Sequence, residues 1–433
     1  MKNITVGIIL LLLLAHSATA QSVLSLDEAK AITLANNFGI KIAKNNVTIA
    51  KNQTEKSVNG YLPTVAANGA LTGNFGGSNQ KFSNGLEAST SNAFNWGGNA
   101  ALTANYTIFD QRRALTLDQL KQSLTLSNLQ LRQTIEQNLL SVYNSYYQVA
   151  QLSENVNALE EAISISKERM RRAQIQLDLG QGNGLNVLNA KVDIQRDSVN
   201  LLNSKLNLDN AKRDLNIFMG RDATEAFTIA TNVDQNLALE LEALLEESRN
   251  ENINIKINRQ NLAVNEMNLQ IIEAERQPTV TAGASYNFSY SDNATGSFID
   301  QSNSQGLAGN VGVNWTIFDG TRKIRKQNTL LNLSNQKLQI SQFQQQLERD
   351  IINAWSNYKN ALFVLEVEKN AVETNRENFV RTEEQVKIGR LTSIEFRQAQ
   401  LNLLSAQTSL NNAKFSIKLR EIQLLQLVGR LME

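Results

Sequence analysis

The chain lacks cysteine and has a single histidine, His16, among its 433 residues. Without cysteine it has no thiol nucleophile and no thiolate zinc ligand. His16 lies in a segment that we expect to be cleaved, so the mature protein would also lack the commonest general base. We therefore expect a protein that is not an enzyme and that binds neither a cofactor nor a metal ion.

The first 20 residues have the pattern of a secretory signal peptide. Lys2 supplies the positive start, an apolar run follows from Ile8 to Leu14, and Ala18-Thr19-Ala20 fits a small-residue cleavage site. The apolar run is too short for a membrane span, which takes about 20 residues. We expect residues 1–20 to be removed from an exported protein; an uncleaved anchor is the alternative.

Neither sign of charge is in excess after cleavage. The full chain has 42 basic and 41 acidic residues, and the loss of Lys2 leaves 41 of each. Nucleic-acid binding needs a surplus of Lys and Arg on one face, so no nucleic acid is expected as a partner. No later segment has 18 consecutive apolar residues. An exported chain of this kind is soluble, extracellular or a membrane β-barrel.

The sequence contains one unit written twice. Residues 105–110 (NYTIFD) recur 209 positions later as NWTIFD at 314–319, and the segment around Pro63 recurs 215 positions later at Pro278. We therefore predict two repeats after the signal, at 21–220 and 221–433, with one loop six residues shorter in the second. Further pairs at the 209-residue offset are Gly180 and Gly389, Ala190 and Ala399, Leu215 and Leu424, and Gly220 and Gly429.

Each repeat contains a pair of segments in which apolar and polar residues alternate. Between 279 and 289, one face carries Val280, Ala282, Ala284, Tyr286 and Phe288, and Thr, Gly, Ser and Asn fill the other. A period of two predicts strands. Polar, Gly- and Asn-rich residues at 76–95 and 291–306 are expected as loops. The predicted strands are about 62–75 and 96–109 in the first repeat, and about 278–290 and 307–318 in the second.

Long helices follow these strands. Residues 111–179 and 321–388 contain neither Gly nor Pro, and apolar residues recur every seven positions from Ile135 and from Ile351. The predicted helices are 110–179 and 185–219 in the first repeat, and 319–388 and 390–428 in the second. Each long helix would reach roughly 100 Å. Glycine favours a left-handed helix end, so we expect helix hairpins that turn at Gly180 and Gly389.

Four residues mark the changes between helix and strand. Pro63 and Pro278 are the only prolines, and both stand where a helical pattern gives way to a strand pattern. Asp110 and Asp319 stand where strand gives way to helix, and we interpret them as helix N-caps rather than catalytic carboxylates.

The strand pattern favours a membrane β-barrel. A soluble β-sandwich is the alternative interpretation. Strand length, small polar residues on the second face and aromatic residues near the strand ends are typical of outer-membrane barrels. Four strands cannot close a barrel, and open edges are not tolerated in lipid. Several chains must therefore share one barrel.

Several short motifs occur in a fixed order and mostly twice: Leu24-Ser25-Leu26-Asp27-Glu28-Ala29, Tyr61-Leu62-Pro63, Ile108-Phe109-Asp110 with its repeat, Gly180 with Leu188-Asn189-Ala190, Gly389 with Gln398-Ala399-Gln400, and Leu215/Gly220 with Leu424/Gly429. In motif order and doubling, the mature sequence resembles the TolC-like outer-membrane efflux proteins over essentially its whole length. Two departures are Arg276-Gln277 before Pro278, and the extra glycines Gly182 and Gly184 in the first hairpin turn.

The resemblance implies an α+β membrane protein with two repeats of helix, β-hairpin, long helix and helix hairpin. A homotrimer would form a 12-stranded β-barrel in the outer membrane of a Gram-negative bacterium and an α-helical barrel in the periplasm. The implied function is an exit duct for efflux or type I secretion of small molecules or proteins. Its partners would be outer-membrane lipid, a periplasmic adaptor (membrane fusion) protein and an inner-membrane transporter. A trimeric coiled-coil adhesin or structural protein is the alternative from another class.

The resemblance also places functional residues at the hairpin turns. It implies a periplasmic gate at Glu395, with Gln398 where the family has a second acid and Asn186 as the first-repeat counterpart of Glu395. The alternative for Glu395 is a solvated acid in the first turn of a helix. The adaptor would dock at the turns, on Gly180, Gln181, Gly389, Arg390 and Leu391.

Overall fold

A computed structural model describes residues 23–232, 239–293 and 299–432, so the expected signal peptide at 1–20 lies outside the described residues. The chain divides into two compact units. We call them the helical unit (residues up to 45, 129–257 and 340 onward) and the strand unit (46–128 and 258–339). Both units draw on both halves of the sequence, so they do not coincide with the repeats predicted above. Within the described part of the chain, no helix combines the length and hydropathy needed to cross a membrane.

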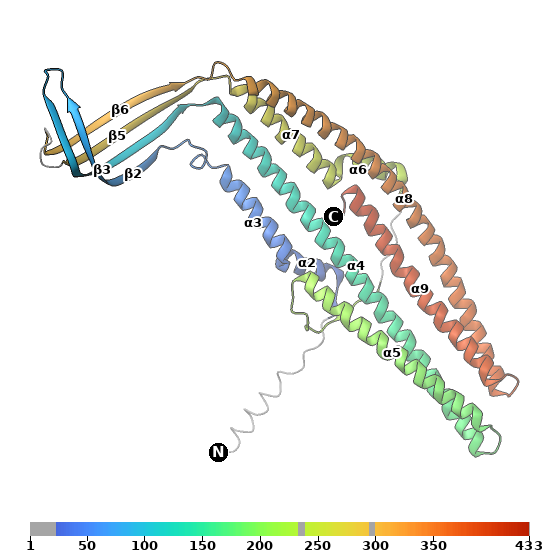
Figure 1. The fold of residues 1–433 in the computed structure, drawn as a ribbon. Coiled ribbons are helices and arrows are strands. Elements are labelled where there is room, and N and C mark those ends of the chain that lie inside the picture. Colours follow the sequence, from blue (N-terminus) through green and yellow to red (C-terminus); the bar gives the residue numbers. More distant parts are fainter. Residues whose placement is uncertain (1–22, 233–238, 294–298, 433) are drawn as a thin grey trace, which may run out of the picture. The chain divides into compact units, whose positions relative to one another are not determined.

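The strand unit contains one antiparallel sheet (Figure 1). Its strands are β2 (Thr64–Lys81), β3 (Glu87–Phe109), β5 (Thr279–Asp292) and β6 (Gln301–Asn314), in the order β2-β3-β5-β6. The two hairpins therefore join through β3 and β5, and β2 and β6 are the edges of the sheet.

The register gathers the apolar residues on one face. Tyr286 pairs with Leu102 on one side and Leu307 on the other, and Ala282 pairs likewise with Tyr106 and Val311. Directly paired residues point to the same side of a sheet, so this face is apolar across the strands. It is uncovered in the single chain: Leu307 is 81% exposed.

The strands are longer than the sequence indicates. β2 and β3 stay paired as far as Lys81 and Glu87, whose side chains form a 2.7 Å ion pair. The loop expected at 76–95 is therefore wrong and shrinks to 82–86. The loop expected at 291–306 shrinks to 293–300, of which 294–298 lie outside the described residues. Gly and Asn have low strand propensity, but pairing with a partner strand overrides it.

β6 ends earlier than expected, at Asn314 instead of 318. Asn314 pairs with Thr279, the first residue of β5, so the residues after Asn314 have no strand opposite them. The Trp315 indole N–H instead donates to the carbonyl of Arg276, 2.9 Å away. The strand thus ends where its pairing partner ends, although apolar and polar residues continue to alternate in the sequence.

The long helices have equal lengths. α4 (Gln111–Asp178) and α8 (Gly320–Lys387) have 68 residues each, and α5 (Gly184–Met219) and α9 (Ser393–Val428) have 36 each. Both pairs are offset by 209 positions. In the helical unit α5 runs back beside α4, and α9 beside α8 (Figure 1). The start of α9 falls three residues after the predicted 390, because Thr392 caps the helix.

Shorter helices complete each half. These are α2 (Leu26–Asn36) and α3 (Phe38–Gln53), then α6 (Leu241–Glu251) and α7 (Ile253–Ala274). In the helical unit, two short strands that the sequence did not predict, β1 (Val23–Leu24) and β4 (Thr228–Ile229), pair in parallel.

Three apolar clusters lie in the helical unit, and the smallest, around Phe379 and Phe396, is near the hairpin turns. The first is centred on α4 and contains Val142, Val149 and Val156, which are three of the predicted heptad positions. The second joins Ile351 and Tyr358 of α8 to the end of α9. Buried heptad positions are what a helix packed along its length against other helices requires.

Candidate functional site

The first hairpin turn is closed by a glycine in left-handed conformation. Gly180 has φ +70°, and the backbone N–H groups of Gly180 and Gln181 donate to the carbonyls of Leu177 and Gln176 at 3.0 and 2.8 Å. This pair of bonds satisfies the last carbonyls of α4. A Cβ on Gly182 would lie 2.8 Å from the backbone nitrogen of Leu177, so glycine is required there as well.

The second turn repeats the same closure. Gly389 has φ +74°, and Gly389 and Arg390 donate to the carbonyls of Val386 and Gln385 at 3.1 and 2.9 Å. Gln181 in the first turn and Arg390 in the second are both exposed. Of the predicted docking residues, Gln181 and Arg390 therefore have accessible side chains on hydrogen-bonded turns, whereas Leu391 is half-buried.

The helices that leave the two turns start differently. Asn183 caps α5 by accepting the backbone N–H of Leu185 at 2.9 Å. At the start of α9 the backbone N–H of Glu395 donates to the Thr392 hydroxyl at 3.3 Å, and the backbone N–H of Thr392 donates to Glu395 Oε2 at 2.7 Å. This is a capping box. The backbone and side-chain hydrogen bonds from Thr392 hold the pKa of Glu395 below its usual value.

The three predicted gate residues do not share one surface. Glu395 and Gln398 are exposed on α9, and the amide of Gln398 donates to Asn402 at 2.8 Å. Asn186 is half-buried and lines a cavity instead. Glu395 thus has the helix-start role that was its alternative interpretation, and a role in gating stays a prediction.

The cavity beside Asn186 lies between the two hairpins and has a volume of about 500 Å³. Phe379 of α8 and Phe396 of α9 stack against each other in its wall, with ring centroids 5.3 Å apart. Arg172 of α4 reaches Glu383 of α8 at 3.2 Å. An apolar wall with an ion pair at its edge therefore links the hairpins close to their turns.

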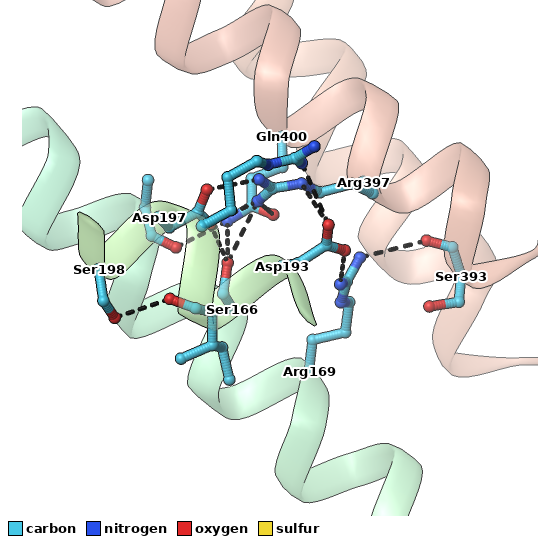
Figure 2. A network of polar contacts seen from close by, with 11 residues as sticks. Ser166, Arg169, Asp193, Asp197, Ser198, Ser393, Arg397 and Gln400 are labelled. Carbon is cyan, nitrogen blue, oxygen red and sulfur yellow. Dashed lines mark hydrogen bonds and ion pairs between the residues drawn. The ribbon is translucent and has the colours of Figure 1, made fainter. Parts of the chain in front are cut away.

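Next to this cavity, a buried polar cluster joins α4, α5 and α9 (Figure 2). We call Ser166, Asp197, Arg397 and Gln400 the Arg397 cluster. Arg397 is 8% exposed, and its guanidinium donates to both carboxylate oxygens of Asp197 at 2.7 and 2.6 Å. It also donates to the amide oxygen of Gln400 at 3.0 Å, and Gln400 donates to the Ser166 hydroxyl at 3.0 Å.

A second ion pair extends the cluster toward the turns. Arg169 of α4 pairs with Asp193 of α5, and its guanidinium also donates to the carbonyl of Ser393 at the start of α9 (Figure 2). Arg169 belongs to a basic run of Lys167, Arg169, Arg171 and Arg172, a pattern that favours a solvated helix face, with a docking surface as the alternative. Arg169 is not solvated, because it is 8% exposed and paired with Asp193.

Sequence reasoning missed the Arg397 cluster. Arg397 and Asp197 are 200 positions apart, and neither belongs to a motif of recognised spacing. The one signal available is that Arg397 stands where the 209-residue offset places Leu188 in the first repeat. A charged residue in place of an apolar one suggests that these two helix faces have different neighbours.

The junction residues lie in the strand unit, where the sequence predicted changes of structure. Pro63 directly precedes β2, and Pro278 directly precedes β5. Asp110 accepts the backbone N–H of Arg112 at 2.9 Å, and Asp319 accepts that of Thr321 at 2.9 Å. Both are the contacts of a helix N-cap.

Comparisons with known proteins agree with this architecture. A search of curated proteins finds the outer membrane efflux protein BepC of Brucella suis biovar 1 (strain 1330), 23% identical over 412 residues, covering 91% of this chain and 81% of BepC. Among solved structures, the Campylobacter jejuni CmeC outer membrane channel has a TM-score of 0.73 at 16% identity, covering 94% of this chain and 86% of CmeC. The open state of the Neisseria gonorrhoeae MtrE outer membrane channel has a TM-score of 0.69 at 17% identity, covering 94% and 89%.

These likenesses confirm the fold, with its helix, β-hairpin, long helix and helix hairpin in each half. The family model described as outer membrane efflux protein matches residues 31–221 and 244–430, well over half of the chain. The prediction made from the motifs is thereby confirmed, together with the expected place of the protein in the outer membrane. The chain belongs to the outer membrane efflux protein family.

Proposed function

We propose that the protein is a passive exit duct in the outer membrane, through which an efflux or type I secretion system releases small molecules or proteins. The observation that carries the proposal is the sheet of the strand unit. One of its faces is apolar and uncovered, and among the described residues each edge strand, β2 and β6, is paired on one side only. Such a sheet is suited to lipid only as part of a closed barrel.

Three copies would complete the barrel. Four strands per chain make a 12-stranded ring in which β6 of one copy pairs with β2 of the next. In a barrel of about eight strands, side chains alone can fill the interior. A 12-stranded barrel is wider, so a passage can remain open along its axis. The polar face of Thr, Asn and Ser residues would line it, and the apolar face would meet lipid.

The proposed partners are a periplasmic adaptor and an inner-membrane transporter. Membership of an efflux family supports this, and the two exposed hairpin turns offer the docking points. In this cysteine-free chain, a cysteine at Gln181 or Arg390 should crosslink to an adaptor in cells. Crosslinks that arise only from cysteines placed in residues 82–86 would contradict docking at the turns.

The trimeric adhesin considered from the sequence has no observation in its favour. Its anchoring strands would be expected at one end of the chain. Here β2 and β3 lie in the first half of the sequence and β5 and β6 in the second. We propose transport, with no catalytic role.

The test is assembly and conductance of the purified protein. We expect a trimer by mass in detergent and stable single-channel conductance in planar bilayers. A monodisperse monomer, or a trimer that leaves the bilayer non-conducting under all conditions that open gated channels, would overturn the proposal.

The gate is proposed at Glu395, where three copies would place three carboxylates around the passage. A ring of acidic side chains selects cations and repels anions. Glu395→Gln should therefore lower cation selectivity in single-channel recordings, with Ser405→Ala, at an exposed position further along the same helix, as the control. Unchanged selectivity and unchanged block by trivalent cations would leave Glu395 only its role in the capping box.

A further inference from the structure

We propose that the cavity between the two hairpins binds a small aromatic carboxylate. This cavity, which we call the hairpin cavity, has a volume of about 500 Å³ and is lined by side chains of α4, α5, α8 and α9. A volume of this size is typical of small-molecule sites. An occupant would contact both hairpins close to their turns. Its binding would not depend on whether the protein serves as a duct.

One wall of the hairpin cavity is apolar and aromatic. Phe379 and Phe396 are 8% and 4% exposed, and Ile165 of α4 packs against them. The two ring centroids lie 5.3 Å apart at an interplanar angle of 53°. Aromatic rings add favourable edge or offset contacts to other rings at such distances. This wall is therefore suited to the planar apolar body of an aromatic ligand.

A buried donor without a partner belongs to the same lining. Arg169 is 8% exposed, and its Nε has no hydrogen-bond partner among the described residues. The outer nitrogens of this guanidinium bind Asp193 and the carbonyl of Ser393 (Figure 2). A buried N–H group without an acceptor is destabilising, because it has lost its water without gaining another bond. A ligand that presents an acceptor to Arg169 would remove this deficit.

The acidic side chains of the lining are already paired. Glu383 lies 3.2 Å from Arg172 and 3.3 Å from Lys387. Hydrogen bonds from Arg171 and then Arg172 lower the pKa of the Glu168 carboxyl to about 2. Each carboxylate is therefore shared by two basic groups and has little attraction left for a cation.

The chemistry of the ligand follows from these two parts of the lining. An unpartnered donor on a charged guanidinium, with every lining acid paired, favours an anion over a cation. A carboxylate forms the strong, charge-assisted hydrogen bonds that a guanidinium makes best. An aromatic carboxylate would place its ring on the apolar wall and its oxygen atoms toward Arg169.

Calorimetry with two probes of the same shape tests the ligand class. Biphenyl-4-carboxylate is titrated into the purified full chain in detergent, with the titration into micelles alone as the blank. We expect saturable binding of one probe per chain, and binding of biphenyl-4-methylammonium at least tenfold weaker. No saturable binding of the carboxylate would overturn the proposal. Equal or tighter binding of the ammonium probe would also overturn it.

A pair of phenylalanine variants tests the location. Ala173 is 9% exposed in the lining, so Ala173→Phe would fill part of the cavity. Gln174→Phe adds the same ring at the next residue, which is exposed and outside the lining. We expect Ala173→Phe to weaken binding of the carboxylate at least tenfold and Gln174→Phe to leave it unchanged. Equal affinities would place the bound probe elsewhere and contradict the site.

A second pair of variants tests the role of Arg169 without filling the cavity. In Arg169→Met, Asp193 keeps Arg196 at 3.1 Å, so no buried acid is left unpaired. We expect this variant to weaken binding of the carboxylate at least tenfold and to leave the weaker binding of the ammonium probe unchanged. Lys167→Met removes the same charge from an exposed position outside the lining and should change neither. An equal loss for both probes in Arg169→Met would contradict recognition of the carboxylate by Arg169.

Discussion

The two helix hairpins have the same helix lengths, yet their second helices, α5 and α9, differ in how far the equivalent face is buried. In the second hairpin, α9 is covered by α4 and contributes Arg397 to a buried ion pair. In the first, α5 presents Leu188 at the equivalent position, exposed. At equivalent positions of the two hairpins, a paired, buried Arg397 thus stands against an apolar, exposed Leu188. Helices of equal length in the two halves therefore differ in what their surfaces contact within the chain.

The largest effect on stability is expected from removing the positive charge of Arg397, which the first hairpin lacks at the equivalent position. Arg397→Leu leaves Asp197 buried without its partner, which should cost about 3–5 kcal/mol of unfolding free energy. Urea titration followed by circular dichroism measures it. The double variant Arg397→Leu with Asp197→Leu should recover most of the loss, because no unpaired charge remains. If Arg397→Leu alone is as stable as the wild type, the cluster contributes nothing to the α4–α9 interface.

The apolar and polar faces of the sheet can be compared in the same way, by placing one charge on each. Val311 lies on the apolar face, and its neighbour Asn310 lies on the polar one. Val311→Arg should reduce folding into lipid by roughly 2–4 kcal/mol if the residue lies near mid-membrane. Asn310→Arg should assemble normally and alter conductance. Equal assembly of both variants, with wild-type conductance for Asn310→Arg, would show that the register assigned to the strand is wrong.

The two turns can be compared through their glycines. Gly389→Ala meets no neighbouring atom but must keep a positive φ, which should cost about 1–2 kcal/mol. Gly182→Ala keeps an ordinary φ but would place its Cβ 2.8 Å from a backbone nitrogen, so the first turn has to shift. Hydrogen exchange should show faster exchange at the end of α4 for Gly182→Ala and unchanged exchange at the end of α8 for Gly389→Ala. Faster exchange in α8 with no change in α4 would contradict the turn geometry.

The smallest effect concerns the capping box that only the second hairpin has. The lowered pKa of Glu395 means that its carboxylate stabilises α9 above pH 4.5 and that this stabilisation is lost as the pH falls through the lower folded pKa. Glu395→Gln should slightly lower the thermal midpoint at neutral pH and match the wild type in strong acid. Asn183→Ala, which removes the cap of α5, should lower the midpoint equally at both pH values. A pH-independent difference for Glu395→Gln would exclude a contribution from its charge.

Much of the architecture could be predicted, because local patterns determine it. The absence of Gly and Pro between 111 and 179 predicted α4, and the seven-residue period of apolar residues predicted that Val142 and Val149 are buried. Strand ends could not be predicted, because they depend on whether a partner strand continues opposite. β2 runs on through Gly and Asn residues that β3 pairs with, and β6 stops at Asn314 where β5 begins.

The candidate site was predicted less completely. The turns at Gly180 and Gly389 follow from the conformational freedom of glycine. The sequence placed Glu395 near the start of a helix, but its capping box with Thr392 was missed because the helix was predicted to begin at 390. The bond between Arg397 and Asp197 joins residues far apart in sequence. No periodicity encodes such a pair, since it depends on how three helices come together.

The position of α9 in the chain determines when the helical unit can close. It is the last helix, and the hydrogen bond between Asn155 and Asn411 spans 256 positions. Contacts of such separation form late, because a long loop must be closed first. The side of α4 that α9 covers therefore stays uncovered until the chain has been made as far as α9. A chain that stopped before α9 would leave the apolar residues of α4 around Phe415 without their partner.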